Sequence, residues 1–217
     1  IGKDISSLIG QEKKLNVKIQ GAKEFDEFLK THDVDIAVIT TTSVFAENYP
    51  AYVTCAQNGV NAISTCEEAF YAQNSNPKLA KKLDKLAKEN GCTICGSGYQ
   101  DVFWGNLISV IGGATHKITK IIGKSSYNVE DYGISLAKVH GAGLTKEQFK
   151  KQINEPENIT DEELKKQISS GKFAPSFMWN VNGWLCAKLG LHVESQTQKS
   201  VPQIAEEDIY SKTLDMT

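Results

Sequence analysis

Short apolar runs separated by stretches of helical length organise the first half of the chain. Residues 35–40 are rich in β-branched side chains and are too short for a helix, which is typical of a strand buried on both faces of a parallel sheet. A second apolar run covers residues 60–64 and a third covers residues 92–95. The helix before the third run begins at Pro77 and has an apolar stripe between lysines. This alternation predicts βαβ units in a parallel sheet.

A small polar turn follows each predicted strand, at residues 41–43, 65–68 and 96–98. Parallel strands joined by crossover helices share one direction, so their carboxyl ends, and these three turns, should lie at one edge of the sheet. Open α/β sheets bind ligands beyond that edge. The Gly-Ser-Gly sequence of the third turn lets a ligand approach the backbone, although a lone G-x-G is weak as a phosphate-binding motif.

The pattern changes in the second half of the chain. Residues 117–122 and 191–201 alternate between apolar and polar positions, as half-exposed strands of an antiparallel sheet do. The sequence therefore predicts an α/β fold: a partial Rossmann-type parallel sheet in residues 1–114, followed by an α+β domain with a mostly antiparallel sheet in residues 115–217.

Three helical features accompany this division. Residues 101–113 are apolar on nearly all sides and predict a buried helix. Thr145 and Gln148 have the spacing of a capping box at the start of another helix. Residues 177–185, the segment densest in aromatic side chains, are expected to be helical.

Charge and composition exclude several classes of function. With 24 basic and 26 acidic residues among 217, the net charge of −2 gives no reason to expect nucleic acid or an anionic membrane as a partner. No run approaches the ~20 apolar residues of a membrane span, so we expect a cytoplasmic protein. The five cysteines, an odd number, argue against a disulfide framework. Cys92 and Cys95 point to opposite faces of a strand and could not share a metal, so no metal site is predicted.

The first residues lack the opening strand and tight glycine turn with which an α/β chain normally begins. We expect a fragment without its first βαβ unit.

The residues at the three strand ends carry a resemblance to a known family. Residues 41–43, the Cys66-Glu67-Glu68-Ala69-Phe70-Tyr71 segment and residues 96–98, with the later change to alternation, resemble NAD(P)-dependent amine dehydrogenases. The family is that of 2,4-diaminopentanoate dehydrogenase and its native amine-dehydrogenase relatives, more distantly related to dihydrodipicolinate reductases. The resemblance covers nearly the whole chain. It is most specific at residues 64–71, 87–98 and 126–132. It does not extend to the family's glycine-rich first turn and C-terminal elements, which we expect to be absent from these residues.

The resemblance implies hydride transfer between NAD or NADP and the carbon that bears a primary amine, with ammonia as the co-product. It places a catalytic glutamate in the acid pair, with Glu68 slightly favoured over Glu67. A carboxylate there would hold a cationic nitrogen and take a proton. From the residues alone, two adjacent acids are also common in the first turn of a helix, where the dipole stabilises them.

The resemblance also implies which other residues form the site. The cofactor would contact the small turns, and aromatic side chains would line the substrate pocket, although each aromatic residue is also explained as ordinary core. Separately, the alternation at residues 117–122 and 191–201 and the aromatic-rich segment predict a homodimer through the exposed face of the antiparallel sheet of the second domain. The cofactor-binding candidates are Thr41, Thr42, Ser43, Cys66, Gly96, Gly98 and Tyr99, and the pocket candidates are Trp104, Tyr127, Tyr132 and Trp179.

Two other functions remain open from the sequence. A reductase of cyclic imines or simple ketones would use the acid pair only to cap a helix, and it would not need ammonia. A non-catalytic dimerisation or regulatory module would need no cofactor. The substrate, its stereochemistry and the choice between NAD and NADP are not encoded in the motifs found here.

Overall fold

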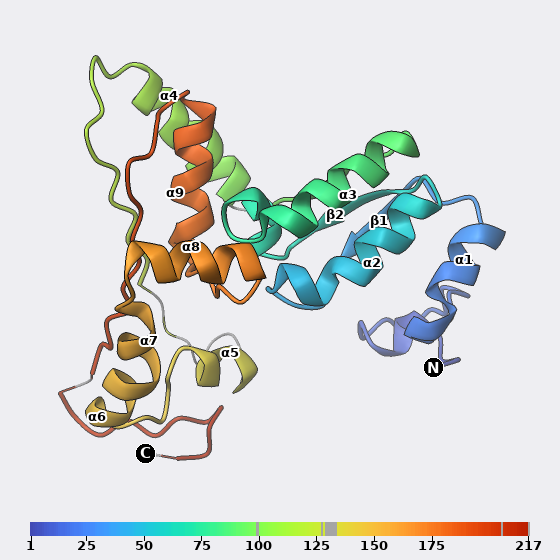
Figure 1. Ribbon diagram of the computed structural model, residues 1–217. Coiled ribbons are helices and arrows are strands. Elements are labelled where there is room, and N and C mark those ends of the chain that lie inside the picture. The colour runs from blue at the N-terminus through green and yellow to red at the C-terminus, as the bar shows by residue number, and fades with distance from the viewer. Residues whose placement is uncertain (99, 127, 129–133, 205, 217) are drawn as a thin grey trace. The chain divides into compact units, whose positions relative to one another are not determined.

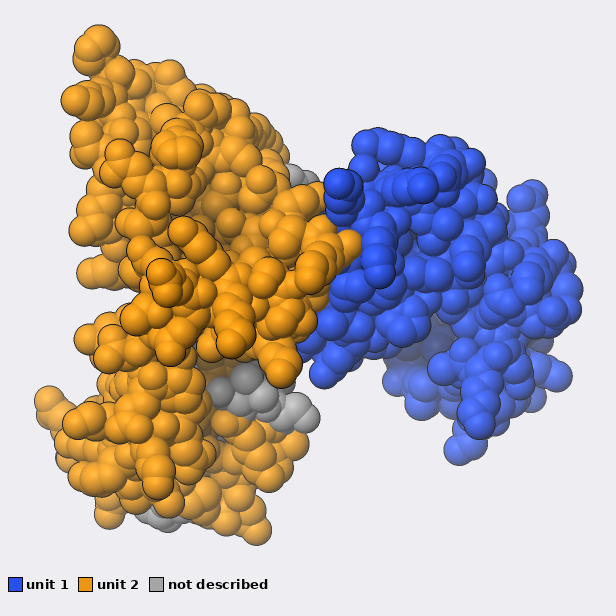
Figure 2. Space-filling model, viewed as in Figure 1, with its two compact units in different colours: residues 1–69, 79–97 blue, residues 70–78, 98–217 orange. Residues whose placement is uncertain are grey.

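A computed structural model describes residues 1–98, 100–126, 128, 134–204 and 206–216 (Figure 1). The chain divides into two compact units: unit 1 holds residues 1–69 and 79–97, and unit 2 holds residues 70–78 and 98–217 (Figure 2). The division thus falls near residue 97. The two functional domains predicted at residues 1–114 and 115–217 stay a prediction.

Unit 1 is built around a three-stranded parallel sheet with the strand order β1-β2-β3, so the predicted α/β class is confirmed. The predicted helix at Pro77 is also confirmed, and it ends before Gly91, whose φ is +65°. The elements are η1 (Ile5–Ser7), η2 (Ala22–Glu24), α1 (Phe25–Thr31), β1 (Ile36–Ile39), α2 (Phe45–Gln57), β2 (Asn61–Ser64), η3 (Glu68–Asn74), α3 (Pro77–Glu89) and β3 (Ile94–Gly96), of which η3 and α3 continue into unit 2.

The two faces of this sheet differ in burial. Successive crossovers of the usual right hand place α2 and α3 on one face, where Ile39 and Ala62 are buried. The side chains of Ile36 and Val38, which point the other way, are 53% and 67% exposed. The prediction that the first strand is buried on both faces is therefore wrong for the described residues, because both crossover helices cover the same side.

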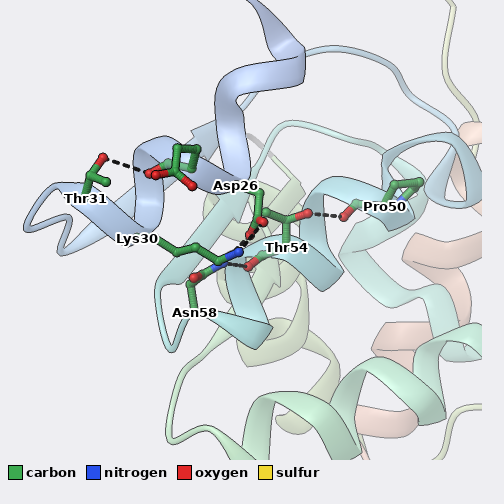
Figure 3. A network of polar contacts seen from close by, with 7 residues as sticks. Asp26, Lys30, Thr31, Pro50, Thr54 and Asn58 are labelled. Carbon is green, nitrogen blue, oxygen red and sulfur yellow. Dashed lines mark hydrogen bonds and ion pairs between the residues drawn. The ribbon is translucent and has the colours of Figure 1, made fainter.

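A polar network joins α1 to the C-terminal end of α2 (Figure 3). The Asp26 carboxylate forms an ion pair with Lys30 Nζ at 2.6 Å and accepts a hydrogen bond from Asn58 Nδ2 at 3.0 Å. Asn58 Nδ2 also donates to the Thr54 carbonyl at 2.8 Å. The hydrogen bonds from Lys30 and then from Asn58 lower the pKa of Asp26. This network fixes one end of α2, and the candidate site lies at its other end.

Unit 2 is mainly helical in its described part. Its core consists of Met178, Val181 and Leu185, against which Phe70 and Trp184 pack. The predicted capping box is confirmed, since Thr145 N–H donates to Gln148 Oε1 at 2.9 Å and Gln148 N–H donates to Thr145 Oγ1 at 3.2 Å. The elements are a π-helix η4 (Gln100–Ile108), α4 (Ser109–Gly113), α5 (Ile134–Val139), α6 (Lys146–Phe149), a π-helix η6 (Lys150–Asn154), α7 (Glu155–Glu157), α8 (Asp161–Ser170) and α9 (Phe177–Lys188).

The predicted antiparallel sheet is not formed by the described residues of this unit. Residues 117–122 and 191–201 have no strand pairing, because alternation favours an extended backbone but does not supply the neighbouring strand. Side chains hold the second segment instead. Gln196 Nε2 donates to the Trp179 carbonyl at 2.6 Å, and Gln198 Oε1 accepts from Ser176 N–H at 2.6 Å.

The helical segment 100–113 also differs from its prediction. Ile108 packs against the core, but Val110 and Ile111 are 71% and 59% exposed. The segment therefore buries one side rather than its whole circumference. An all-apolar sequence could not reveal this, because it gives no polar face by which to orient the helix.

Gly183 lets the side chain of Asn74 approach α9 closely. A Cβ at position 183 would lie 2.2 Å from Asn74 Nδ2, which donates to the carbonyl of Trp179 at 3.2 Å and to Gln196 Oε1 at 3.0 Å. We expect Gly183→Ala to lower the free energy of unfolding by about 1–3 kcal/mol. The overpacking and the lost hydrogen bonds outweigh the gain in helix propensity of about 1 kcal/mol.

Urea unfolding of the wild type and of Gly183→Ala would check this expectation. In an Asn74→Ala background the clash is absent, and Gly183→Ala should then no longer destabilise. An equal loss in both backgrounds would contradict the assigned contact.

Candidate active site

The three polar turns lie at one edge of the sheet, as predicted. Ile39 pairs with Ser64, and Ser64 pairs with Gly96, so the ends of the three strands lie in one row. The pairing extends past the strands, because Thr65 N–H donates to the Ile39 carbonyl at 3.2 Å and Ser97 N–H donates to the Ser64 carbonyl at 2.9 Å. This carboxyl edge is where an open α/β sheet binds its ligand.

The first turn is fastened to α2 by its threonine hydroxyls. Thr42 Oγ1 donates to Glu47 Oε2 at 2.7 Å and accepts from Val44 N–H at 3.2 Å, while the Thr41 hydroxyl donates to Asn48 Oδ1. Asn48 Nδ2 donates to the Thr42 carbonyl at 2.8 Å. Both threonine hydroxyls thus have structural partners, although Thr41, like Ser43, is exposed.

The two acids of the second turn have different surroundings. Glu68 is 7% exposed, and its Oε2 accepts a hydrogen bond of 2.7 Å from the N–H of Phe45, the first residue of α2. The Glu68 N–H donates to the Ser43 carbonyl at 3.4 Å. Glu67 is half-buried. The Glu68 carboxylate therefore caps the positive end of α2, whereas Glu67 is the more accessible acid.

This arrangement adds a contact to what the sequence predicted. Glu68 lies in the first turn of η3, and its carboxylate also accepts a hydrogen bond from the first N–H of another helix, α2. Phe45 precedes Glu68 by 23 positions, so no local pattern indicates the contact. The catalytic assignment of either acid stays a prediction.

Cys66 is an internal part of the second turn. It is 2% exposed, and burial raises the pKa of its thiol. Its N–H donates to Ser64 Oγ at 3.1 Å. In this position Cys66 holds the turn, and its side chain packs inside the protein.

The remaining candidates are divided between the units or lie outside the described residues. Gly96 ends β3 in unit 1, whereas Gly98, with φ +147°, and Trp104 belong to unit 2. Trp179 of unit 2 is 4% exposed, and its indole N–H donates to the Asn74 carbonyl at 3.1 Å, as expected of a core residue. A shared site with unit 1 stays a prediction for these residues. The undescribed candidates are Tyr99, Tyr127 and Tyr132.

The sequence did not single out three residues that hold this edge together. Asn48 and Tyr52 lie on the inner side of α2, and Ser64 is the last residue of β2. A sequence signal existed, because two polar side chains spaced i, i+4 lie on the buried side of a helix. The partners that give them their role are not sequence neighbours.

Two kinds of feature are missing from the part of the chain that the structure describes. Within it, no three or more His, Cys, Asp or Glu side chains are grouped so that they could hold a metal ion. None of its helices combines the length and the apolar character that crossing a membrane requires.

Parallel strands, crossover helices and polar turns at one edge define part of a Rossmann-type α/β fold. Comparison with curated proteins identifies the 2,4-diaminopentanoate dehydrogenase of Acetoanaerobium sticklandii as similar, with 27% identity over 138 residues, which are 63% of this chain and 38% of that protein. The solved amine dehydrogenase from Mycobacterium smegmatis is similar in structure, with a TM-score of 0.79 and 34% identity. That match covers 100% of this chain and 59% of the solved chain.

The resemblance to amine dehydrogenases that the strand ends predicted is thereby confirmed. No family model matches the chain. The chain spans less than two thirds of the length of each of these two relatives.

Proposed function

We propose that this chain is part of an NAD(P)-dependent oxidoreductase that acts on a primary amine, by oxidative deamination or, in reverse, by reductive amination of a ketone. The names of its two relatives support the class of reaction. The observation that carries the proposal is the acid-bearing turn at the carboxyl edge, where Glu67 stays accessible while Glu68 is tied to α2. A diaminopentanoate-like compound or a small amine is the proposed substrate.

The residues present fit one end of a nicotinamide nucleotide. Residues 41–43 form a polar turn in which Thr41 and Ser43 are exposed, and Gly96 of the same unit has no Cβ to prevent the approach of a flat ring. The pyrophosphate is a poor fit at the N-terminus of α2, because the Glu68 carboxylate already occupies that position. When bound, NAD or NADP would supply the hydride chemistry. The residues of this chain have to orient the amine and stabilise its positive charge.

We assign the charge-bearing role to Glu67. A carboxylate beside the amine nitrogen stabilises the ammonium and the iminium that replaces it, and it can take a proton from the attacking water. Glu68 then positions the turn through Phe45. Its burial against the helix end argues against a second acid in direct contact with substrate.

Steady-state assays of the whole protein test the proposal. Oxidation of small primary amines, 2,4-diaminopentanoate among them, should reduce NAD or NADP, and reduction of the matching ketone should require ammonia. Ketone reduction that proceeds equally well without ammonia would point to the imine or ketone reductase alternative. Absence of cofactor binding would favour the non-catalytic module.

The association of two copies, the use of ammonia and a cytoplasmic location complete the proposal. The antiparallel sheet that was expected to form the dimer interface is not formed by the described residues. A homodimer would need another surface. Exposed apolar side chains of η4 and α4, such as Leu107 and Val110, provide one on unit 2.

A further inference from the structure

A buried tyrosine is hydrogen-bonded to the strand that leads into the acid-bearing turn. Tyr52 and Ser64 are each only 1% exposed, and the Tyr52 hydroxyl donates to Ser64 Oγ at 2.9 Å. The ring of Tyr52 packs on Phe45, with 5.5 Å between the ring centroids. Burial raises the pKa of Tyr52, so the phenol keeps its proton and acts as a donor.

The Ser64 hydroxyl uses its full hydrogen-bonding capacity at this point. It accepts from Tyr52, accepts from Cys66 N–H at 3.1 Å and donates to the Ile39 carbonyl at 2.9 Å. A hydroxyl has one proton to donate and two lone pairs to accept with, so these three bonds fix its orientation. One side chain thereby joins the end of β1, the start of the acid-bearing turn and helix α2.

Helix α2 holds both turns of the site from one side. Asn48, one helical turn before Tyr52, bonds the first turn through Thr41 and Thr42. Tyr52 reaches the second turn through Ser64. Because the two side chains are spaced i, i+4, they emerge from the same face of the helix, and any shift of α2 would move both turns together.

We propose that Tyr52 and Ser64 are positioning residues for the acid-bearing turn, residues 65–68, and set where Glu67 stands relative to the substrate amine. This inference rests on the function proposed above. Apolar packing alone would be satisfied by a phenylalanine at position 52, whereas the phenol adds a directed bond to the one hydroxyl that orients the Cys66 N–H. Reacting groups must be held in near-attack geometry, and a displacement of about 1 Å can cost about 10²-fold in rate.

Tyr52→Phe in the whole protein tests the inference, because it keeps the ring and removes only the hydroxyl. We expect kcat for amine oxidation to fall about tenfold with the KM for the nucleotide unchanged, since the turn is less well placed but the cofactor contacts remain. Amide exchange at Cys66 and in the rest of the turn should accelerate at least about fivefold. Tyr49→Phe is the matched control, since Tyr49 lies half-buried in the same helix, and it should change neither quantity.

Ser64→Ala, alone and combined with Tyr52→Phe, supplies a second route to the same answer. If both side chains act through one bond, the double variant should lose no more kcat than the more damaged single variant. Additive losses would overturn the inference, as would unchanged exchange in the turn, or unchanged kcat despite faster exchange. Should Tyr52→Phe fail to fold, Ser64→Ala decides by the same two measurements.

The exchange measurement separates this inference from the proposed function. A wild-type protein without amine oxidation would refute the proposed function. In that case faster exchange in Tyr52→Phe, but not in Tyr49→Phe, would still support the positioning of the turn by Tyr52, and equal exchange would overturn it.

Discussion

Replacing Glu67 by Gln should abolish nearly all amine oxidation in the whole protein. Glutamine keeps the shape of the side chain but removes the negative charge that stabilises a cationic nitrogen. Groups aimed at transition-state charge contribute roughly 10²–10³ in rate, or about 3–4 kcal/mol. If the charge of Glu67 serves the reaction and not the fold, the melting temperature should change little. Steady-state kinetics and a thermal melt of the same preparation check both expectations.

Glu68→Gln is the matched comparison for this variant, because the two residues are adjacent and the change is identical. Its side-chain oxygen can still accept from Phe45 N–H, so we expect a smaller loss of turnover than in Glu67→Gln. A larger loss in Glu68→Gln would reverse the roles of the two acids. Turnover that survives in both variants would show that the acid pair is structural and that the proposed mechanism is wrong.

Replacing Glu68 by Ala should lower the free energy of unfolding by about 2 kcal/mol. The change removes a hydrogen bond to a charged acceptor, which contributes about 1.5–3 kcal/mol, and leaves the Phe45 N–H at the start of α2 without this carboxylate. The favourable interaction of the negative charge with the helix dipole is lost as well. Denaturant unfolding at neutral pH measures the difference.

Glu47→Ala is the control for this stability change. Glu47 is an acid in the first turn of the same helix, but it is exposed and accepts from the Thr42 hydroxyl. Exposed first-turn acids contribute about 0.3–1 kcal/mol. If Glu47→Ala and Glu68→Ala destabilised the protein equally, the buried cap would have no special role.

The sequence predicted the sheet and the edge at which the polar turns lie because both depend on local pattern. Short apolar runs with crossovers of helical length determine parallel strands, and parallel strands determine which edge carries the turns. The contact that distinguishes the two acids could not be predicted in this way. Glu68 accepts a hydrogen bond from Phe45 N–H, and only the packing of α2 on the sheet brings these two residues together.

The antiparallel sheet predicted from residues 117–122 and 191–201 is not formed by the described residues, for a related reason. Residues 191–201 form neither helix nor strand, and a segment of this kind can be held by side chains instead of by a ladder. Gln196 and Gln198 provide such hydrogen bonds. The sequence does not distinguish a glutamine that bonds the backbone in this way from one that faces solvent on a strand.

The one-sided covering of the sheet in unit 1 has a practical consequence for measurement. Ile36 and Val38 form an apolar strip on the side away from α2, and strips of this kind favour self-association in solution. When association and folding are linked, the midpoint of a thermal melt depends on the protein concentration. Variants of this chain should therefore be ranked at a single concentration, and a dilution series of the wild type reports how strongly the strip contributes to its apparent stability.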